Sequence, residues 1–189
     1  MQKLETARQL RERIQTVLDT VGREFEPLSD EQLRWKPAPD KWSIAECLQH
    51  LNLAERFYIR NLQHKADGLG LVQHAPTDQP LGSDWVGKSL RWAVDPQVKM
   101  KLPAPSMVRP RSDLDARKTL EQFRELQQLL HDLTDRLSYL DWNTTKIPTL
   151  FGNWLKIRVG DALLMLVAHT ERHLAQAMRV KQTGKFAVN

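Results

Sequence analysis

The strongest constraint on the fold is a set of four long stretches in which apolar residues recur every three or four positions. These stretches cover residues 4–25, 43–65, 112–140 and 155–181. Steps of three and four place side chains on one face of an α-helix, so each stretch predicts an amphipathic helix with one buried face. No stretch has a convincing alternation of apolar and polar residues, the pattern that predicts a β-strand. The sequence therefore predicts an all-α fold, a four-helix bundle.

Composition agrees with one globular domain that spans residues 1–189. The chain has 41% hydrophobic and 27% charged residues, which is typical of a folded protein with a sizeable core. Cys47 is the single cysteine, so no internal disulfide can form and a reducing cytoplasm is the expected location. The first residues do not have the pattern of a signal peptide, and no apolar run is long enough to cross a bilayer, so we expect no membrane among the partners.

The net charge of +5 does not by itself indicate a nucleic-acid-binding protein. Basic residues are spread along the chain and are interleaved with acidic ones. Arg109 and Arg111, in a short loop, are the nearest approach to a cluster. We therefore do not expect a nucleic-acid partner, because nucleic-acid-binding proteins gather their cations on one face.

The connections between the predicted helices constrain their order. Residues 67–111 are rich in glycine and proline, with a short helix expected from Ser83 to Trp92 that buries Trp85 and Trp92. This link is long enough to travel back along a helix of about 33 Å, given a rise of 1.5 Å per residue. The second and third long helices are then parallel, which gives up-down-down-up order. Residues 141–153 are expected to form only a turn-rich connection.

Two histidines on the apolar face of the last predicted helix are the main candidates for chemistry. His169 and His173 lie four residues apart, so their imidazoles are one turn from each other and can bind one cation. His50 lies at the edge of the apolar face of the second helix. We predict that these three histidines, from two helices, meet around one metal ion. The alternative is a set of core histidines satisfied by hydrogen bonds.

Other polar residues near these histidines have simpler roles. Gln176 is one turn beyond His173 and is a candidate to orient it from behind, although an ordinary surface glutamine has the same spacing. Glu46 has the spacing of a capping-box partner for Ser43, which is favoured over a general base. Cys47 is favoured as a packing residue over a metal ligand. No catalytic residue can be named from the sequence.

Two motifs connect the chain with a known family. The segment Trp42-Ser-Ile-Ala-Glu-Cys-Leu-Gln-His50-Leu resembles the second-helix signature of the DinB/YfiT-like superfamily, and His169-x3-His173-x2-Gln176 resembles its fourth-helix motif. The resemblance extends over most of the chain, including the Lys36-Pro37 lead-in. All three histidines of the family pattern are present.

The resemblance implies a DinB-like four-helix bundle with a three-histidine site for a divalent metal, often nickel or zinc. It also implies a homodimer. Characterised members include bacillithiol transferases and a mycothiol-dependent maleylpyruvate isomerase, and the family carries an older description as metal-dependent hydrolases. We therefore expect a metal-dependent enzyme acting on a small-molecule substrate, a transferase that activates a low-molecular-weight thiol, or water. The alternative is a non-catalytic metal- or ligand-binding bundle protein of a stress response.

Overall fold

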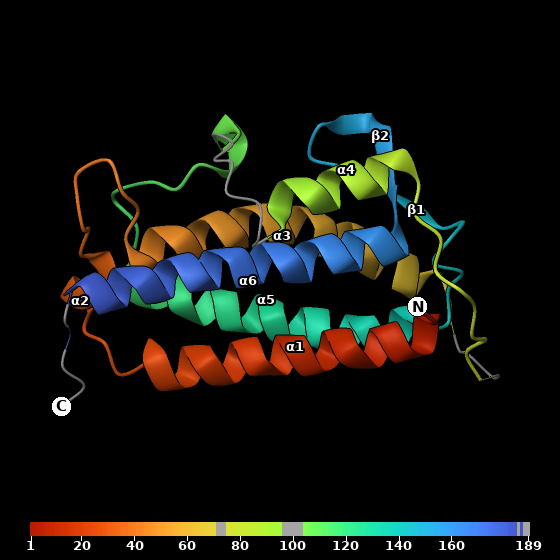
Figure 1. Cartoon of the computed structure of the whole chain (residues 1–189), viewed down its shortest axis with the longest axis horizontal. Helices are drawn as coiled ribbons and strands as arrows, with labels where there is room; N and C mark the ends of the chain where they lie inside the picture. Colours follow the sequence, from red (N-terminus) through yellow and green to blue (C-terminus); the bar gives the residue numbers. More distant parts are fainter. Residues whose placement is uncertain (71–74, 96–103, 185, 187–189) are drawn as a thin grey trace.

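The computed structural model describes residues 1–70, 75–95, 104–184 and 186. Four long helices pack side by side along the longest axis of the molecule (Figure 1). They are α1 (Lys3–Glu24), α3 (Ile44–Asp67), α5 (Ala116–Leu137) and α6 (Val159–Gly184). Each follows one of the four amphipathic stretches, so the predicted four-helix bundle is confirmed.

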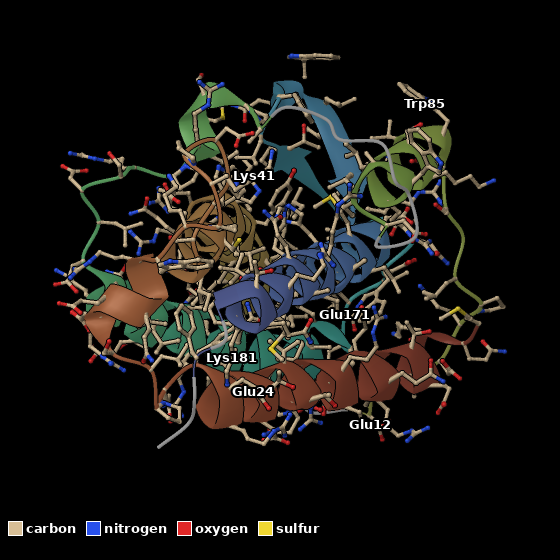
Figure 2. The ribbon with its side chains drawn as sticks, turned by 60° about the vertical axis from the view of Figure 1, so that its left-hand side comes forward. Glu12, Glu24, Lys41, Trp85, Glu171 and Lys181 are labelled. Atoms are coloured by element: carbon tan, nitrogen blue, oxygen red, sulfur yellow. The ribbon has the colours of Figure 1, made fainter. Side chains whose placement is uncertain are left out.

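Cross-helix contacts define the direction of each helix. Asn52 reaches Thr119 and Arg136 reaches Asp67, so residue numbers rise together along α3 and α5. The same is true of α1 and α6, because Arg13 pairs with Glu171 and Lys181 pairs with Glu24. Figure 2 shows the second of these pairs where the two helices meet. By contrast, the ring of His50 on α3 packs against that of His173, whereas Glu55, further along α3, contacts the earlier residue Thr170, so α3 and α6 are antiparallel. The helix order is therefore up-down-down-up.

In the described ranges, five short elements accompany the four long helices. They are α2 (Asp30–Arg34), α4 (Trp85–Val94), the 3-10 helix η1 (Ser106–Val108), and the strands β1 (Lys146–Thr149) and β2 (Gly152–Arg158). The strands form an antiparallel hairpin, so the expectation of no strand was wrong, and α6 begins at Val159 rather than near residue 155. Ile147 and Ile157 pair across the hairpin and are both fully buried, and Gly152 takes the positive φ of 119° that the turn requires.

Side-chain caps begin most of the described helices. Ser43 forms the predicted capping box with Glu46, and Ser29 forms a second one with Gln32. The helices expected to start at Ser83 and Ser112 are capped instead by Asp84 and Asp115, whose carboxylates accept hydrogen bonds from the backbone amides of Gly87 and Lys118. An aspartate side chain accepts a hydrogen bond from the backbone amide three residues later, as a serine cap does. Its negative charge is also attracted to the positive end of the helix.

Helix α4 packs against α6 through a close backbone approach. A Cβ atom on Gly87 would lie 2.1 Å from Oδ2 of Asp161, so only glycine fits here. Asp161, which is 2% exposed, also accepts hydrogen bonds from Ser83 and Arg91. The face of α4 that meets the bundle therefore carries Gly87 beside the apolar side chains Val86, Leu90 and Val94. The tryptophans of α4 do not meet the bundle, which corrects the expectation that they are buried: Trp85 is 73% exposed and Trp92 is 55% exposed, and Figure 2 shows Trp85 at the outer edge of the molecule.

The interior of the bundle contains two apolar clusters. One includes Leu10, Leu62 and Leu163, and the other includes Val21, Leu48 and Phe123. Buried polar side chains lie between them on three of the helices: Asn52 and Glu55 of α3, Gln127 of α5 and Thr170 of α6. We call Glu55, Gln127 and Thr170 the polar layer. It interrupts the core at the level where His50 and His169 face each other.

Within the described ranges, no helix is both long and apolar enough to cross a membrane. The predicted irregular link of residues 67–111 is confirmed as far as it is described, with α4 and η1 as its helical turns. Its residues 71–74 and 96–103 lie outside the described ranges.

Candidate metal centre

The three predicted histidines meet between α3 and α6. His50 lies in the second turn of α3, whose start is fixed by the Ser43 capping box. His169 and His173 lie one turn apart in the middle of α6. One nitrogen from each of the three rings lies within 4.8 Å of a nitrogen of the other two rings. Nε2 of His50 is 3.2 Å from Nε2 of His169. Antiparallel packing of the two helices thus brings together residues that are more than a hundred positions apart.

Hydrogen bonds hold two of the rings from behind. Nδ1 of His50 lies 2.7 Å from the backbone oxygen of Val108, in η1. A carbonyl oxygen only accepts, so Nδ1 carries the hydrogen and Nε2 keeps its lone pair. Nδ1 of His173 lies 3.0 Å from Oε1 of Gln176, which fixes the same form of that ring. Both Nε2 lone pairs are therefore free to face the third histidine.

Burial keeps the imidazoles neutral. Desolvation, as the largest cause, lowers the pKa of His173 to about 3, and repulsion from His50 adds to this. Burial followed by repulsion from His173 and His50 lowers the pKa of His169 well below its ordinary value. Burial also lowers the pKa of His50, against a smaller opposing effect of the Val108 carbonyl. Neutral imidazole is the form that binds a metal ion.

Trp42 forms an aromatic wall of the site. Its ring centroid lies 5.0 Å from that of His50 and 5.8 Å from that of His173, the second pair being stacked. The carboxylates on the neighbouring turns are engaged elsewhere. Glu46 accepts from Lys36 and from the backbone of Ser43, and Glu171 is paired with Arg13. The described part of the site therefore offers neutral nitrogen ligands beside an apolar surface.

The donor set fits a divalent metal ion. Zinc–nitrogen bonds of about 2.0–2.1 Å in a tetrahedral arrangement separate two nitrogens by about 3.3 Å. The distance of 3.2 Å between the Nε2 atoms of His50 and His169 matches this. In His50 and His173, one ring nitrogen donates to a protein acceptor, which leaves the other with a free lone pair. Histidines that bind metals in proteins have the same arrangement. His50, His169 and His173 would hold the ion, with Val108 and Gln176 orienting the first and the last.

The structure brings the four predicted site residues together and adds others. Gln176, for which the sequence also allowed an ordinary surface role, contacts Nδ1 of His173 through Oε1. Cys47 is fully buried in the apolar cluster, where burial raises the pKa of its thiol to about 12. Glu46 forms the capping box with Ser43. Val108 was missed because a backbone carbonyl has no sequence signature. Trp42 was missed as a site residue, although an aromatic residue directly before the Ser43 cap was a usable signal.

Comparison with known proteins agrees with this geometry. A model of the DinB superfamily matches residues 5–177. The uncharacterized protein YuaE of Bacillus subtilis (strain 168) is 27% identical over 159 residues, which are 84% of this chain and 89% of YuaE. The structure of YfiT from Bacillus subtilis, described as a probable metal-dependent hydrolase with an unusual four-helix bundle topology, aligns with a TM-score of 0.57 at 15% identity. The alignment covers 96% of this chain and 89% of YfiT.

The chain therefore belongs to the DinB superfamily, as the two sequence motifs predicted. At 15% identity the likeness to YfiT shows the fold, a four-helix bundle. The three-histidine group is a property of this chain's own residues.

Proposed function

We propose that this protein is a metal-dependent enzyme that binds a divalent ion through His50, His169 and His173 and activates a small nucleophile there. The observation that carries the proposal is the convergence of three imidazole nitrogens on one point. Two of these imidazoles have their second nitrogen engaged by a protein acceptor. Membership of the DinB superfamily supports it, as does the description of YfiT as a probable metal-dependent hydrolase.

The preferred nucleophile is a low-molecular-weight thiol, and water is the second choice. When bound, a divalent ion supplies the Lewis acidity that makes a thiol or water nucleophilic at neutral pH. Both nearby carboxylates are engaged, Glu46 with Lys36 and Glu171 with Arg13. A thiol depends less on a general base than water does, because its own pKa is already near 8.5. The reaction proposed is therefore transfer of the thiol to an electrophilic small molecule.

The residues around the histidines have distinct roles in this proposal. Val108 and Gln176 keep the rings of His50 and His173 in the form whose Nε2 lone pairs face the centre. Trp42 covers two of the rings with an apolar face and excludes water from that side. Three protein nitrogens leave one position of a tetrahedral ion for the nucleophile, the pattern of catalytic rather than structural zinc sites.

The proposal is tested with a thiol screen. Protein stripped with a chelator and reloaded with Zn²⁺ or Ni²⁺ is mixed with 1-chloro-2,4-dinitrobenzene and bacillithiol, mycothiol or glutathione. We expect turnover with at least one thiol, lost in the His50→Ala variant and retained in His64→Ala, which lies outside the site. Rates equal to those of His50→Ala with every thiol would count against the transferase.

The alternative function is a non-catalytic metal- or ligand-binding bundle protein of a stress response. The engagement of both nearby carboxylates favours it, because no general base is offered by the described site. It predicts that chelation lowers thermal stability while no thiol or ester substrate turns over. Turnover that depends on the metal and on His50 excludes it.

The remaining expectations are part of the same proposal. Nickel and zinc are the preferred ions, because neutral imidazole suits both. A homodimer, a cytoplasmic location and a small-molecule substrate follow from the family resemblance and from the single cysteine. Elemental analysis of protein purified without added metal and sedimentation velocity test the ion and the dimer.

A further inference from the structure

The polar layer contains a carboxyl group that the proposed reaction does not use. Glu55 is fully buried, with its two oxygens pointing to different helices. Oε1 lies 2.6 Å from Oγ1 of Thr170 on α6, and Oε2 accepts from Nε2 of Gln127 on α5 at 2.5 Å. A single α3 side chain therefore links three helices of the bundle.

Counting hydrogens indicates that this carboxyl is protonated. Oγ1 of Thr170 lies 2.6 Å from Glu55 and also 3.0 Å from the backbone oxygen of Leu166. The hydroxyl has one hydrogen, and the Leu166 carbonyl can only accept it. Both contacts are satisfied together when the carboxyl O–H of Glu55 donates to Thr170 and the threonine hydroxyl donates to Leu166. Complete burial favours the same neutral state, because an isolated buried carboxylate is costly.

The position of this link relates it to the metal centre. Thr170 follows His169 directly, and Glu55 lies five residues after His50, about 7.5 Å along the helix. The two apolar clusters lie on either side of this level. In the described residues, two side-chain hydrogen bonds join α3 to α6. One is between His50 and His169, and the other is between Glu55 and Thr170.

We propose that Glu55 is a positioning residue for the candidate metal centre, which through Thr170 sets the spacing of α3 and α6 where His50 meets His169. The inference rests on the proposed metal site. A metal ion tolerates little error in the separation of its ligands, and the three nitrogens come from two helices. A link one residue from His169 holds that separation in the absence of an ion.

The chain offers a matched control for the test. Thr134 on α5 is fully buried and donates to the backbone oxygen of Leu130, as Thr170 does to Leu166. Within the described residues, the hydroxyl of Thr134 forms no hydrogen bond to another helix, so Thr134→Val and Thr170→Val remove the same local hydrogen bond. Only Thr170→Val also removes the link to α3. Glu55→Leu removes the link from the other side, and Glu55→Gln restores a donor to Thr170.

The experiment measures Zn²⁺ and Ni²⁺ dissociation constants of the chelator-stripped full chain by titration calorimetry, with apo melting temperatures alongside. We expect Thr170→Val and Glu55→Leu to bind roughly tenfold more weakly than the wild type, the scale of losses for residues that orient metal ligands. Thr134→Val and Glu55→Gln should retain wild-type affinity. Thr170→Val is nearly isosteric, and it keeps the test valid if Glu55→Leu fails to fold.

The possible results separate the two proposals. If the wild type binds neither ion, the proposed function fails, and the role of Glu55 falls with it. If the wild type binds an ion but Thr170→Val binds as tightly as Thr134→Val, the positioning role alone is overturned. The positioning role would also be overturned if Thr134→Val bound the ion as weakly as Thr170→Val and both variants had lower melting temperatures. The weaker binding would then result from lost stability of the fold.

Discussion

Nδ1 of His50 lies 2.7 Å from the backbone oxygen of Val108, 58 residues further along the chain. This contact joins a candidate metal ligand on α3 to the link between α3 and α5. Val108 is itself buried, so its side chain anchors η1 while its carbonyl orients the imidazole. The η1 segment is thus part of the site and not only a connection.

Shortening the side chain at position 108 should therefore weaken metal binding. Val108→Ala removes two buried methyl groups, about 1.6 kcal/mol of burial, and lets η1 move away from His50. We expect Zn²⁺ affinity roughly tenfold lower by titration calorimetry. Met107→Ala, at the exposed neighbouring position, is the control and should bind as the wild type does. Equal affinities for the two variants would show that the carbonyl is held by other contacts.

Removal of a histidine should abolish stabilisation by metal. A ligand present at 100 times its dissociation constant stabilises the fold by about 2.7 kcal/mol, which raises the melting temperature. We expect this rise with Zn²⁺ or Ni²⁺ for the wild type and for His131→Ala, since His131 contacts Asp132 away from the site. His169→Ala should show none. An undiminished rise in His169→Ala would place the ion elsewhere.

Acid should destabilise the apo protein through the same histidines. Burial lowers the pKa of His169 and His173, the latter to about 3 from an ordinary 6.5. Below pH 6.5 the unfolded chain binds protons that the folded chain does not, so the free energy of unfolding falls as pH falls. The loss is about 1.4 kcal/mol per pH unit for each such group. Urea titrations between pH 6.5 and 4.5 measure it, and His173→Gln should have a shallower slope than the wild type.

Glu55 should have the opposite dependence on pH. Burial raises its pKa to about 8 from an ordinary 4.5, against the smaller effects of Thr170 and Gln127. Between these values the folded chain keeps a proton that the unfolded chain releases, so stability falls as pH rises, by about 1.4 kcal/mol per unit. Between pH 7 and 8, above the ordinary histidine pKa of 6.5, the three site histidines are largely neutral in both states, so Glu55→Gln should remove most of this slope. A slope that persists in urea titrations of the variant must come from another group.

The packing of α4 on α6 should not tolerate a methyl group at position 87. The Cβ atom of Gly87→Ala would lie 2.1 Å from Oδ2 of Asp161, so the backbone of α4 must shift. Overpacking of this kind costs about 1–3 kcal/mol, measured by urea unfolding. Gly68→Ala is the matched control, because the atom nearest to its Cβ is 3.5 Å away. Gly87→Ala, but not Gly68→Ala, should lose stability and also show faster amide hydrogen exchange in α4. Unchanged exchange in α4 would show that α6 shifts instead.

Several features of the fold followed from local sequence. The apolar spacing located the four long helices, because helix periodicity is a local property of the chain. The Ser43 capping box was readable for the same reason, since its partners are three residues apart. The β1–β2 hairpin was not, because its strands are short and depend on burial of Ile147 and Ile157 under neighbouring helices. The exposure of Trp85 and Trp92 was mispredicted because the face of α4 that packs is decided by Gly87 and Asp161.

By itself, the sequence determined which side chains could act as ligands: three histidines on the apolar faces of two helices, with Gln176 one turn beyond His173. Only the tertiary structure decided that their nitrogens converge, and that Val108 and Trp42 join them. It also decided that Glu55 is a link between helices rather than a surface acid. The physical reason is that periodicity fixes the face on which a residue lies, whereas the rotation and register of one helix against another depend on packing across the whole core.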